Sequence, residues 1–341
     1  MHPLRHSLRP GLLRIVPAVL TCFTLIGSAA LAQNCQTSAE LDDANRTALT
    51  SAGQRYFDMA AKGDAASLQQ NAIASLASNF SAIEATVKDR QKDLSGAQAT
   101  VKSTFLLDAE GTAPIPNAQF YCGVFGKNGQ TTGSAVFTLA NLPPGKYGVV
   151  ILNATSGQAQ TDFALILQQV GTDWKLGGLY IKGAQVAGHD SDWYIARARE
   201  YKSKGQLHNA WLYYTEARSL ISPLPFMSTL ETDKLYDESQ GAQPADVPAN
   251  GKTADLGAGA STYKLTEMFP EPVGSDLDVI VRYQAADISN TTQAYQSNVA
   301  VIKALTAKYP ELRNAFAGVV ARAVDPSGRD YGTMLAMKDI K

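Results

Sequence analysis

The stretch that decides the fold lies at residues 146–181 and reads KYGVVILNATSGQAQTDFALILQQVGTDWKLGGLYI. Its apolar residues, many of them Val, Ile, Leu or aromatic, form runs at 146–153, 161–170 and 173–181. Turn-forming residues separate the runs, as in the Thr-Ser-Gly triplet at 155–157. Runs of this length and composition, bounded by turn signals, are typical of β-strands. We therefore predict three consecutive antiparallel strands here.

The segments that precede this stretch change from a helical to a strand period. Apolar and small residues recur three, four and seven places apart over 38–61, which predicts an amphipathic helix that stops at Gly63. Asp64 can cap a second helix, and a third helix is predicted over 81–94. Further strands are predicted at 99–107, 119–125 and 134–139. Helices followed by an antiparallel meander predict the α+β class, with the helices packed on the sheet.

The helical period returns after Gly188. Two helices that meet at Gly205, followed by a covering helix at 225–238, predict a helical segment over 190–238. Residues 239–260 are rich in Gly, Ala, Pro, Asp and Asn, so we predict a flexible linker there. Residues 261–341 predict a small β-α-β-β domain. Its expected strands and helix lie at 277–283 (strand), 295–309 (helix), 316–324 (strand) and 331–337 (strand).

The first 32 residues have the pattern of a secretory signal peptide. They carry Arg5, Arg9 and Arg14 without an acidic residue, and they end in an Ala-Leu-Ala triplet. A transmembrane helix needs about 20 apolar residues, whereas the stretch at 15–26 has only 12. We predict cleavage after Ala32, export to the periplasm or the extracellular space, and no membrane anchor on the mature chain.

The composition of the chain excludes some classes of protein. The 341 residues are 45% hydrophobic and 18% charged, which is typical of folded domains and not of disordered chains. Without the three arginines of the leader, 27 basic residues face 31 acidic ones, a net charge of −4. This balance argues against a nucleic-acid partner, because such a protein needs a basic face. The sequence carries no dinucleotide, phosphate-loop or His-Glu-x-x-His motif, so no cofactor is predicted.

The predicted mature chain keeps two cysteines, Cys35 and Cys122. In an oxidising compartment such a pair is most simply a disulfide, which on the chain-entropy account stabilises the fold by roughly 4 kcal/mol. Two free thiols are the alternative. A metal or redox site is less favoured, because neither cysteine has a second one nearby and only His189 and His208 follow the leader.

Two stretches of the first domain resemble a known family. The run QRYFDMAAKGD at 54–64, and the run DWKLGGLYI at 173–181, are similar to the first helix and closing strands of cystatin-like, NTF2-like domains. The resemblance covers about 38–182, and we take the domain as 36–187. It implies a curved antiparallel sheet that wraps the helices into a cone whose mouth holds a small ligand. A competing resemblance, of Pro-rich stretches near 114 and 143 to a carboxypeptidase-regulatory-type β-sandwich, leaves the preceding helices unexplained.

The helical segment resembles a single tetratricopeptide hairpin over about 190–223. Small and aromatic residues stand at the spacing of that repeat, with Gly205 at the turn. These residues are Tyr194, Ala198, Tyr201, Ala210, Tyr214 and Ala217. One hairpin cannot bury its apolar face alone, so we expect it to pack on a neighbour.

Tyr56 is the residue that the first resemblance points to. In the ketosteroid-isomerase group of that family, a tyrosine of the first helix donates a hydrogen bond to an enolate while a carboxylate moves the proton. Tyr56 stands at the matching position, but residues 78–81 read Ser-Asn-Phe-Ser where the acidic cluster would follow. A phenol without a base cannot abstract a proton. We therefore name no catalytic residue, and keep Tyr56 either as a ligand-binding residue or as a core aromatic.

Two short patterns are candidates for a catalytic pair and for a metal site. Ser261 and Lys264 match the Ser-x-x-Lys pattern of acyl enzymes, but the other elements of that chemistry are missing. His189, Asp190 and Asp192 could begin a metal site, although Ser191 or Asp192 more simply caps the helix that starts at Trp193. No metal site is predicted.

Two functional classes remain. The first is a non-catalytic exported protein that binds a small apolar ligand in the cone, or a protein partner on the aromatic residues of the hairpin. Those residues are Trp193, Tyr194, Tyr201, Trp211, Tyr213 and Tyr214. The second is an isomerase- or hydrolase-type enzyme that uses Tyr56 in a pocket. The environment of Tyr56 and the exposure of the hairpin aromatics distinguish the two.

Overall fold

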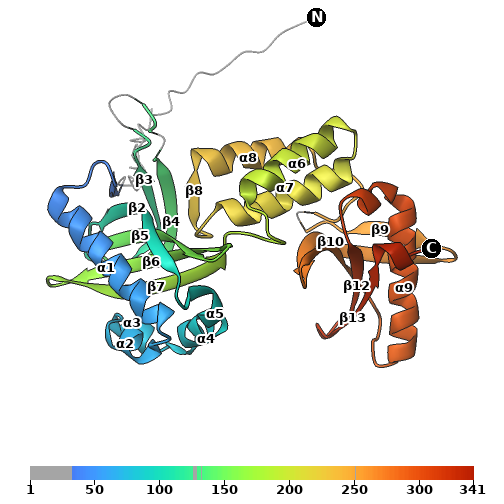
Figure 1. The fold of residues 1–341 in the computed structure, drawn as a ribbon, viewed down its shortest axis with the longest axis horizontal. Helices are drawn as coiled ribbons and strands as arrows, with labels where there is room; N and C mark the ends of the chain where they lie inside the picture. Colours follow the sequence, from blue (N-terminus) through green and yellow to red (C-terminus); the bar gives the residue numbers. More distant parts are fainter. Residues whose placement is uncertain (1–32, 126–128, 132, 250) are drawn as a thin grey trace, which may run out of the picture. The chain divides into compact units, whose positions relative to one another are not determined.

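A computed structural model describes residues 33–125, 129–131, 133–249 and 251–341. Helices and mainly antiparallel sheets share the described chain, so the α+β class is confirmed (Figure 1). The predicted signal peptide at 1–32 lies outside the described residues.

The stretch at 146–181 forms the centre of a five-stranded antiparallel sheet with the order β1-β2-β5-β6-β7. The central strands are buried on both faces, which explains why their sequences are almost continuously apolar. The five strands are β1 (Asn34–Thr37), β2 (Gln98–Ala109), β5 (Gly145–Ser156), β6 (Ala159–Val170) and β7 (Asp173–Gly183). The predicted strands of this stretch are confirmed, with ends that differ by at most three residues.

Helices cover one face of this sheet, where alternate residues such as Val150, Phe163 and Leu165 meet Leu49 and Phe57. The helices are α1 (Asp43–Ala61), α2 (Ala65–Gln70), α3 (Ala74–Ala77), α4 (Ser81–Asp89) and α5 (Gln91–Leu94). The first helix begins five residues later than predicted, because β1 joins the sheet and the Asp42 side chain caps Asn45 N–H. Asp64 caps α2 as predicted, through the Ser67 N–H.

The opposite face of the sheet carries a second core, to which Phe105, Val149 and Ile166 contribute. A three-stranded sheet covers it, with the order β3-β4-β8. Its strands are β3 (Ile115–Cys122), β4 (Ala135–Leu142) and β8 (Met227–Thr229). The predicted disulfide joins Cys35 of β1 to Cys122 of β3 and so links the two sheets.

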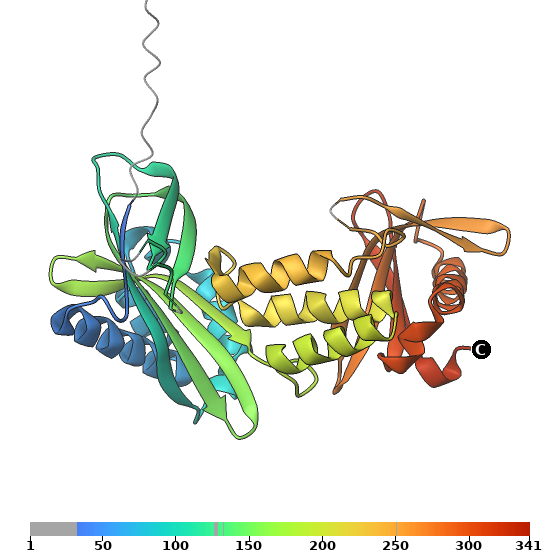
Figure 2. The ribbon, with the colours of Figure 1, turned by 90° about the horizontal axis from the view of Figure 1, so that it is seen from above.

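Three helices follow the first domain, and they run side by side (Figure 2). They are α6 (Ser191–Ser203), α7 (Leu207–Ile221) and α8 (Leu230–Gln240). The turn between α6 and α7 has Gly205 at φ +73°, a left-handed conformation that favours glycine. The predicted hairpin is therefore present, and the covering helix begins five residues later than expected because β8 precedes it.

The last domain is a five-stranded sheet with the order β13-β12-β11-β10-β9. β11 and β12 are parallel, and the helix α9 connects them. The elements are β9 (Ala254–Ala258), β10 (Ser261–Val273), β11 (Asp276–Gln284), α9 (Thr291–Lys308), the 3₁₀ turn η1 (Pro310–Asn314), β12 (Gly318–Val324), β13 (Asp330–Ala336) and the 3₁₀ turn η2 (Met337–Asp339). The predicted β-α-β-β order is found, and β9 and β10, which sequence reasoning missed, extend the sheet.

The stretch 239–260, predicted as a flexible linker, is corrected by the structure. It begins within α8 and contains β9, and three of its apolar residues, Ala242, Val247 and Leu256, are buried. The Tyr309 hydroxyl also donates to the carbonyl oxygen of Asp246 at 2.9 Å. The prediction failed because these few apolar residues find their partners far away in the sequence, where composition gives no signal.

Candidate functional site

Tyr56 is a core residue of the first domain. Its side chain is fully buried, and its hydroxyl donates to the carbonyl oxygens of Trp174 (2.9 Å) and Asn71 (3.0 Å). Burial raises the pKa of the phenol. The hydroxyl is thus used to fasten α1 to β7 and to the turn after α2. The ligand-binding prediction for Tyr56 is corrected accordingly, because no hydrogen atom of the phenol remains for a ligand.

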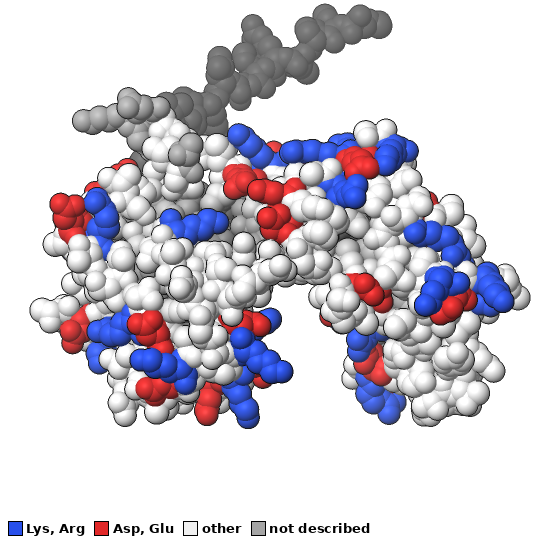
Figure 3. Space-filling view, in the orientation of Figure 1, with Lys and Arg blue, Asp and Glu red and all other residues white. Residues whose placement is uncertain are grey.

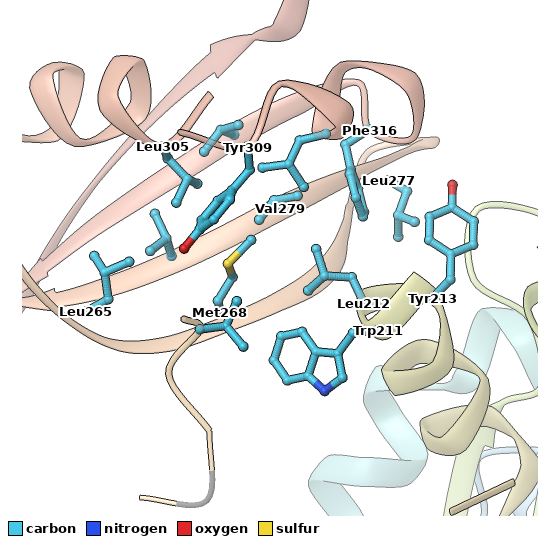
Figure 4. Close-up of a cluster of buried hydrophobic side chains, with 14 of the residues drawn as sticks. Trp211, Leu212, Tyr213, Leu265, Met268, Leu277, Val279, Leu305, Tyr309 and Phe316 are labelled. Carbon is cyan, nitrogen blue, oxygen red and sulfur yellow. The ribbon is translucent and has the colours of Figure 1, made fainter. Parts of the chain in front are cut away.

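The aromatic residues of the hairpin are mostly covered. Tyr194, Trp211, Tyr213 and Tyr214 are buried, and Trp193 and Tyr201 are half-buried. Two of them bond to the C-terminal domain: Tyr213 donates to Ala315 O at 2.8 Å and Tyr201 donates to Asn314 O at 3.1 Å. Tyr194 and Tyr214 instead donate to Val186 O and to the Glu238 carboxylate. Figure 4 shows Trp211, Leu212 and Tyr213 facing apolar residues of that domain. The surface predicted for a protein partner is therefore corrected: the chain itself covers these aromatics, in part with its C-terminal domain.

His208 adds a polar contact to the same junction. Its Nδ1 lies 2.5 Å from a Glu311 carboxylate oxygen, and its Nε2 lies 3.0 Å from an Asp246 carboxylate oxygen. The His208 ring thus joins α7 to η1 and to the segment before β9. This contact supports the packing of α7 on the C-terminal domain.

The two short patterns do not form sites. Ser261 and Lys264 lie on β10, where positions three apart point to opposite faces, so no serine-lysine pair forms. His189 stacks on Trp193 with ring centres 3.7 Å apart, and the helix cap is Asp190 rather than the predicted Ser191 or Asp192. Among the described residues, no three His, Cys, Asp or Glu side chains are grouped to hold a metal ion.

A hollow follows β7, and we call it the β7 groove. It encloses about 1080 Å³. Its walls are the β7 residues between 177 and 182, the α7 residues between 215 and 222, the α8 residues between 232 and 236, and parts of α3 and α4. Most of its lining side chains are apolar, such as Ile83, Ile181 and Met227. Sequence reasoning missed the groove because its walls come from segments far apart in the chain.

β7 is an edge strand, and the described chain leaves part of its outer edge unpaired. At Leu176 the edge is occupied: Leu176 N–H donates to Asn71 O, and Ile73 N–H donates to Leu176 O, both at 2.9 Å. The chain then turns away into α3. From Gly177 to Lys182 the described residues provide no further backbone hydrogen bond to this edge, and the groove runs along it.

Lys182 joins two walls of the groove, β7 and the end of α7, through hydrogen bonds. Its ammonium donates to three carbonyl oxygens at the end of α7, those of Ser219 (2.6 Å), Leu220 (3.2 Å) and Ser222 (2.5 Å). A cation suits the negative end of a helix dipole. Burial lowers the pKa of Lys182, and it raises the pKa of Asp162, which lies opposite Lys182 on β6. The groove therefore has a fixed width at this end.

Arg218 is the second cation of the groove. Its guanidinium lies over the Tyr236 ring, 4.6 Å from the ring centre, and Nη1 lies 3.4 Å from Ser239 Oγ. In the described part of the chain, no carboxylate lies within 4.0 Å of it. The third charged residue of the lining is Asp233 of α8.

A second cavity lies beyond the shared wall of Ile221, Pro223 and Met227, and it encloses about 740 Å³. Its charged residues are of both signs, and two of them, Arg199 and Glu238, form a bidentate pair with both contacts at 2.8 Å. Figure 3 shows basic and acidic side chains interspersed on the face in view.

No family model, no curated protein and no solved structure matches the chain. The NTF2-like and tetratricopeptide-like resemblances therefore stay predictions. Within the described residues, no helix combines the length and the apolar character needed to cross a membrane.

Proposed function

We propose that this chain is an exported, non-catalytic binding protein that holds an extended segment of a partner polypeptide in the β7 groove. The observation that carries the proposal is the unpaired outer edge of β7 from Gly177 to Lys182, which lies beside an apolar groove. Edge strands of this kind bind peptides by adding a strand, with backbone hydrogen bonds for affinity and side-chain pockets for specificity.

The chain itself supplies a precedent for this mode of binding. Residues Asn71–Ile73 already lie on the same edge as a short parallel segment, paired at Leu176. The six residues from 177 to 182 extend that edge by about 20 Å, at roughly 3.3 Å per residue. A peptide of about six residues therefore fits the length of the free edge.

Export is part of the same proposal. The leader pattern at 1–32 and the disulfide between Cys35 and Cys122 both support an oxidising compartment, the periplasm or the extracellular space. We also propose that residues 36–187 are NTF2-like and that residues 190–238 are tetratricopeptide-like. The partner would then be another exported protein, presented as a strand.

A random 12-residue peptide library, displayed on phage and selected against the immobilised protein, tests the binding site. Ala82 of α4 is exposed and lines the groove, so Ala82→Trp fills it without changing the core. Ala85 is exposed on the same helix but is not part of the lining, so Ala85→Trp is the matched control.

We expect selected peptides to bind the wild type and Ala85→Trp, and to lose at least tenfold in affinity for Ala82→Trp. A selection that yields no binding peptide, or peptides whose affinity is the same for both variants, contradicts the proposal. Melting curves of both variants check that each remains folded.

A further inference from the structure

We infer that the β7 groove selects peptides that carry a carboxylate, and that Arg218 receives it. The inference rests on the proposed function, since it names the chemistry of the polypeptide that the groove binds. It starts from the one strongly basic side chain in the lining that has neither a carboxylate nor a set of carbonyl oxygens as its partner in the described structure.

The guanidinium of Arg218 is held in place before any ligand arrives. It lies over the ring of Tyr236 on the neighbouring helix α8, and Tyr236 is 48% exposed. A guanidinium held by such a cation–π contact can still donate from its N–H groups. Among the described residues its one hydrogen bond is the long one from Nη1 to Ser239 Oγ, at 3.4 Å. An arginine fixed in this way is suited to bidentate recognition of a carboxylate.

The charges around Arg218 favour an anion. The lining contains two cations, Lys182 and Arg218, and one carboxylate, Asp233. Lys182 gives its hydrogen bonds to the end of α7, so it contributes positive charge without competing for the ligand's carboxylate. Asp233 lies one helical turn before Tyr236 on α8 and forms no ion pair in the described residues. It repels any acidic ligand, but the two cations leave the lining with a net charge of +1.

The carboxylate can come from two places in a peptide, an Asp or Glu side chain or the free C-terminus. Both present the same pair of oxygens to Arg218. The experiment therefore uses peptides selected against the wild type in four synthetic forms: unchanged, with each acidic residue replaced by its amide, with the C-terminus amidated, and with both changes.

Affinities are measured by calorimetry for the wild type, Arg218→Gln and Arg197→Gln. Arg197 is the matched control, because it also lies over an aromatic ring, 5.5 Å from that of Trp193, but outside the groove lining. We expect Arg218→Gln to lower the affinity for the carboxylate form about tenfold or more. The peptide form in which an amide replaces the received carboxylate should bind the wild type with an affinity lowered by as much. With Arg218→Gln, the same replacement should lower the affinity little further.

The inference is overturned if Arg218→Gln lowers the affinity for the carboxylate and amide forms equally. It is also overturned if Arg197→Gln lowers the affinity for the carboxylate form as much as Arg218→Gln does. The inference and the proposed function fail separately. If Ala82→Trp abolishes binding while Arg218→Gln lowers the affinity for carboxylate and amide forms equally, the groove binds peptides without using a carboxylate. If Ala82→Trp leaves binding unchanged, the groove is not the site and both fail.

Discussion

At the scale of single residues, the hydroxyl and charged groups discussed above mainly join helices and strands through hydrogen bonds. Tyr56, which the resemblance marked as a candidate for chemistry, instead holds α1 against two backbone carbonyls. Lys182 does the same between β7 and α7. Arg218 differs, because its partners are an aromatic face and one distant hydroxyl. This difference is why the structure points to Arg218 rather than Tyr56.

Replacing Tyr56 with Phe tests the structural role. The variant removes one donor from the carbonyl oxygens of Trp174 and Asn71, which keep hydrogen bonds from Arg55 Nη2 and Leu176 N–H, so we expect the free energy of unfolding to fall by about 1 kcal/mol. Urea unfolding measures the change. Tyr295→Phe is the control, since Tyr295 is 48% exposed, and it should change the stability little. Loss of peptide binding in Tyr56→Phe at unchanged stability would instead return Tyr56 to the binding site.

At the scale of elements, α1 packs closely on the sheet because it carries glycine where it crosses β5. A Cβ atom on Gly53 would lie 2.6 Å from Val150 Cγ1. Ala is the better helix former by about 1 kcal/mol, but overpacking of this kind costs about 1–3 kcal/mol. We expect Gly53→Ala to be destabilising by about 1 kcal/mol in thermal or urea unfolding. The exposed Ser51→Ala on the same helix should be neutral, and a stabilised Gly53→Ala would show that the helix can move away from the sheet.

The ion pair between Arg199 of α6 and Glu238 of α8 predicts that the stability of the fold depends on pH. The hydrogen bonds from Arg199 lower the pKa of Glu238 to about 2, although burial opposes this. The carboxylate also accepts from the Tyr214 hydroxyl at 2.6 Å. A carboxyl whose pKa is depressed in the folded state adds stability that is complete above its unfolded pKa, about 4.3, and is lost as the pH falls toward 2.

Acid titration of the unfolding free energy measures this contribution. Because the Arg199 side chain is 61% exposed, screening by water limits the loss between pH 4.5 and 2 to about 1 kcal/mol. In Glu238→Gln that part of the pH dependence should disappear. An unchanged acid profile in the variant would mean that the pair contributes nothing to stability.

At the scale of the whole molecule, the disulfide links β1 of the large sheet to the three-stranded sheet. The bond closes a loop of 87 residues in sequence. We expect the double variant Cys35→Ser/Cys122→Ser to lose about 2–4 kcal/mol of unfolding free energy. Reductant should lower the melting temperature of the wild type and leave that of the variant unchanged. Two free thiols in the non-reduced wild type, titrated after denaturation, would refute the bond.

Much of the fold could be predicted from local patterns, and most of the site could not. The runs at 146–181 predict their strands because burial on both faces demands continuous apolar sequence. The covering of Tyr213 by Phe316, and of Leu256 by the C-terminal core, depends on contacts between distant segments. The β7 groove is also built from distant segments, so neither composition nor spacing reveals it.

Hydrogen–deuterium exchange of the whole protein, with and without a peptide selected from the library, tests the central claim most directly. The strand-addition account predicts that the backbone amides of residues 177–182 that face the free edge exchange more slowly with the peptide bound. These are the amides of alternate residues, because the others already face β6. The amides of β13, the edge strand of the other five-stranded sheet, should exchange at an unchanged rate. Protection that appears at β13 or elsewhere, with residues 177–182 unaffected, would contradict the account.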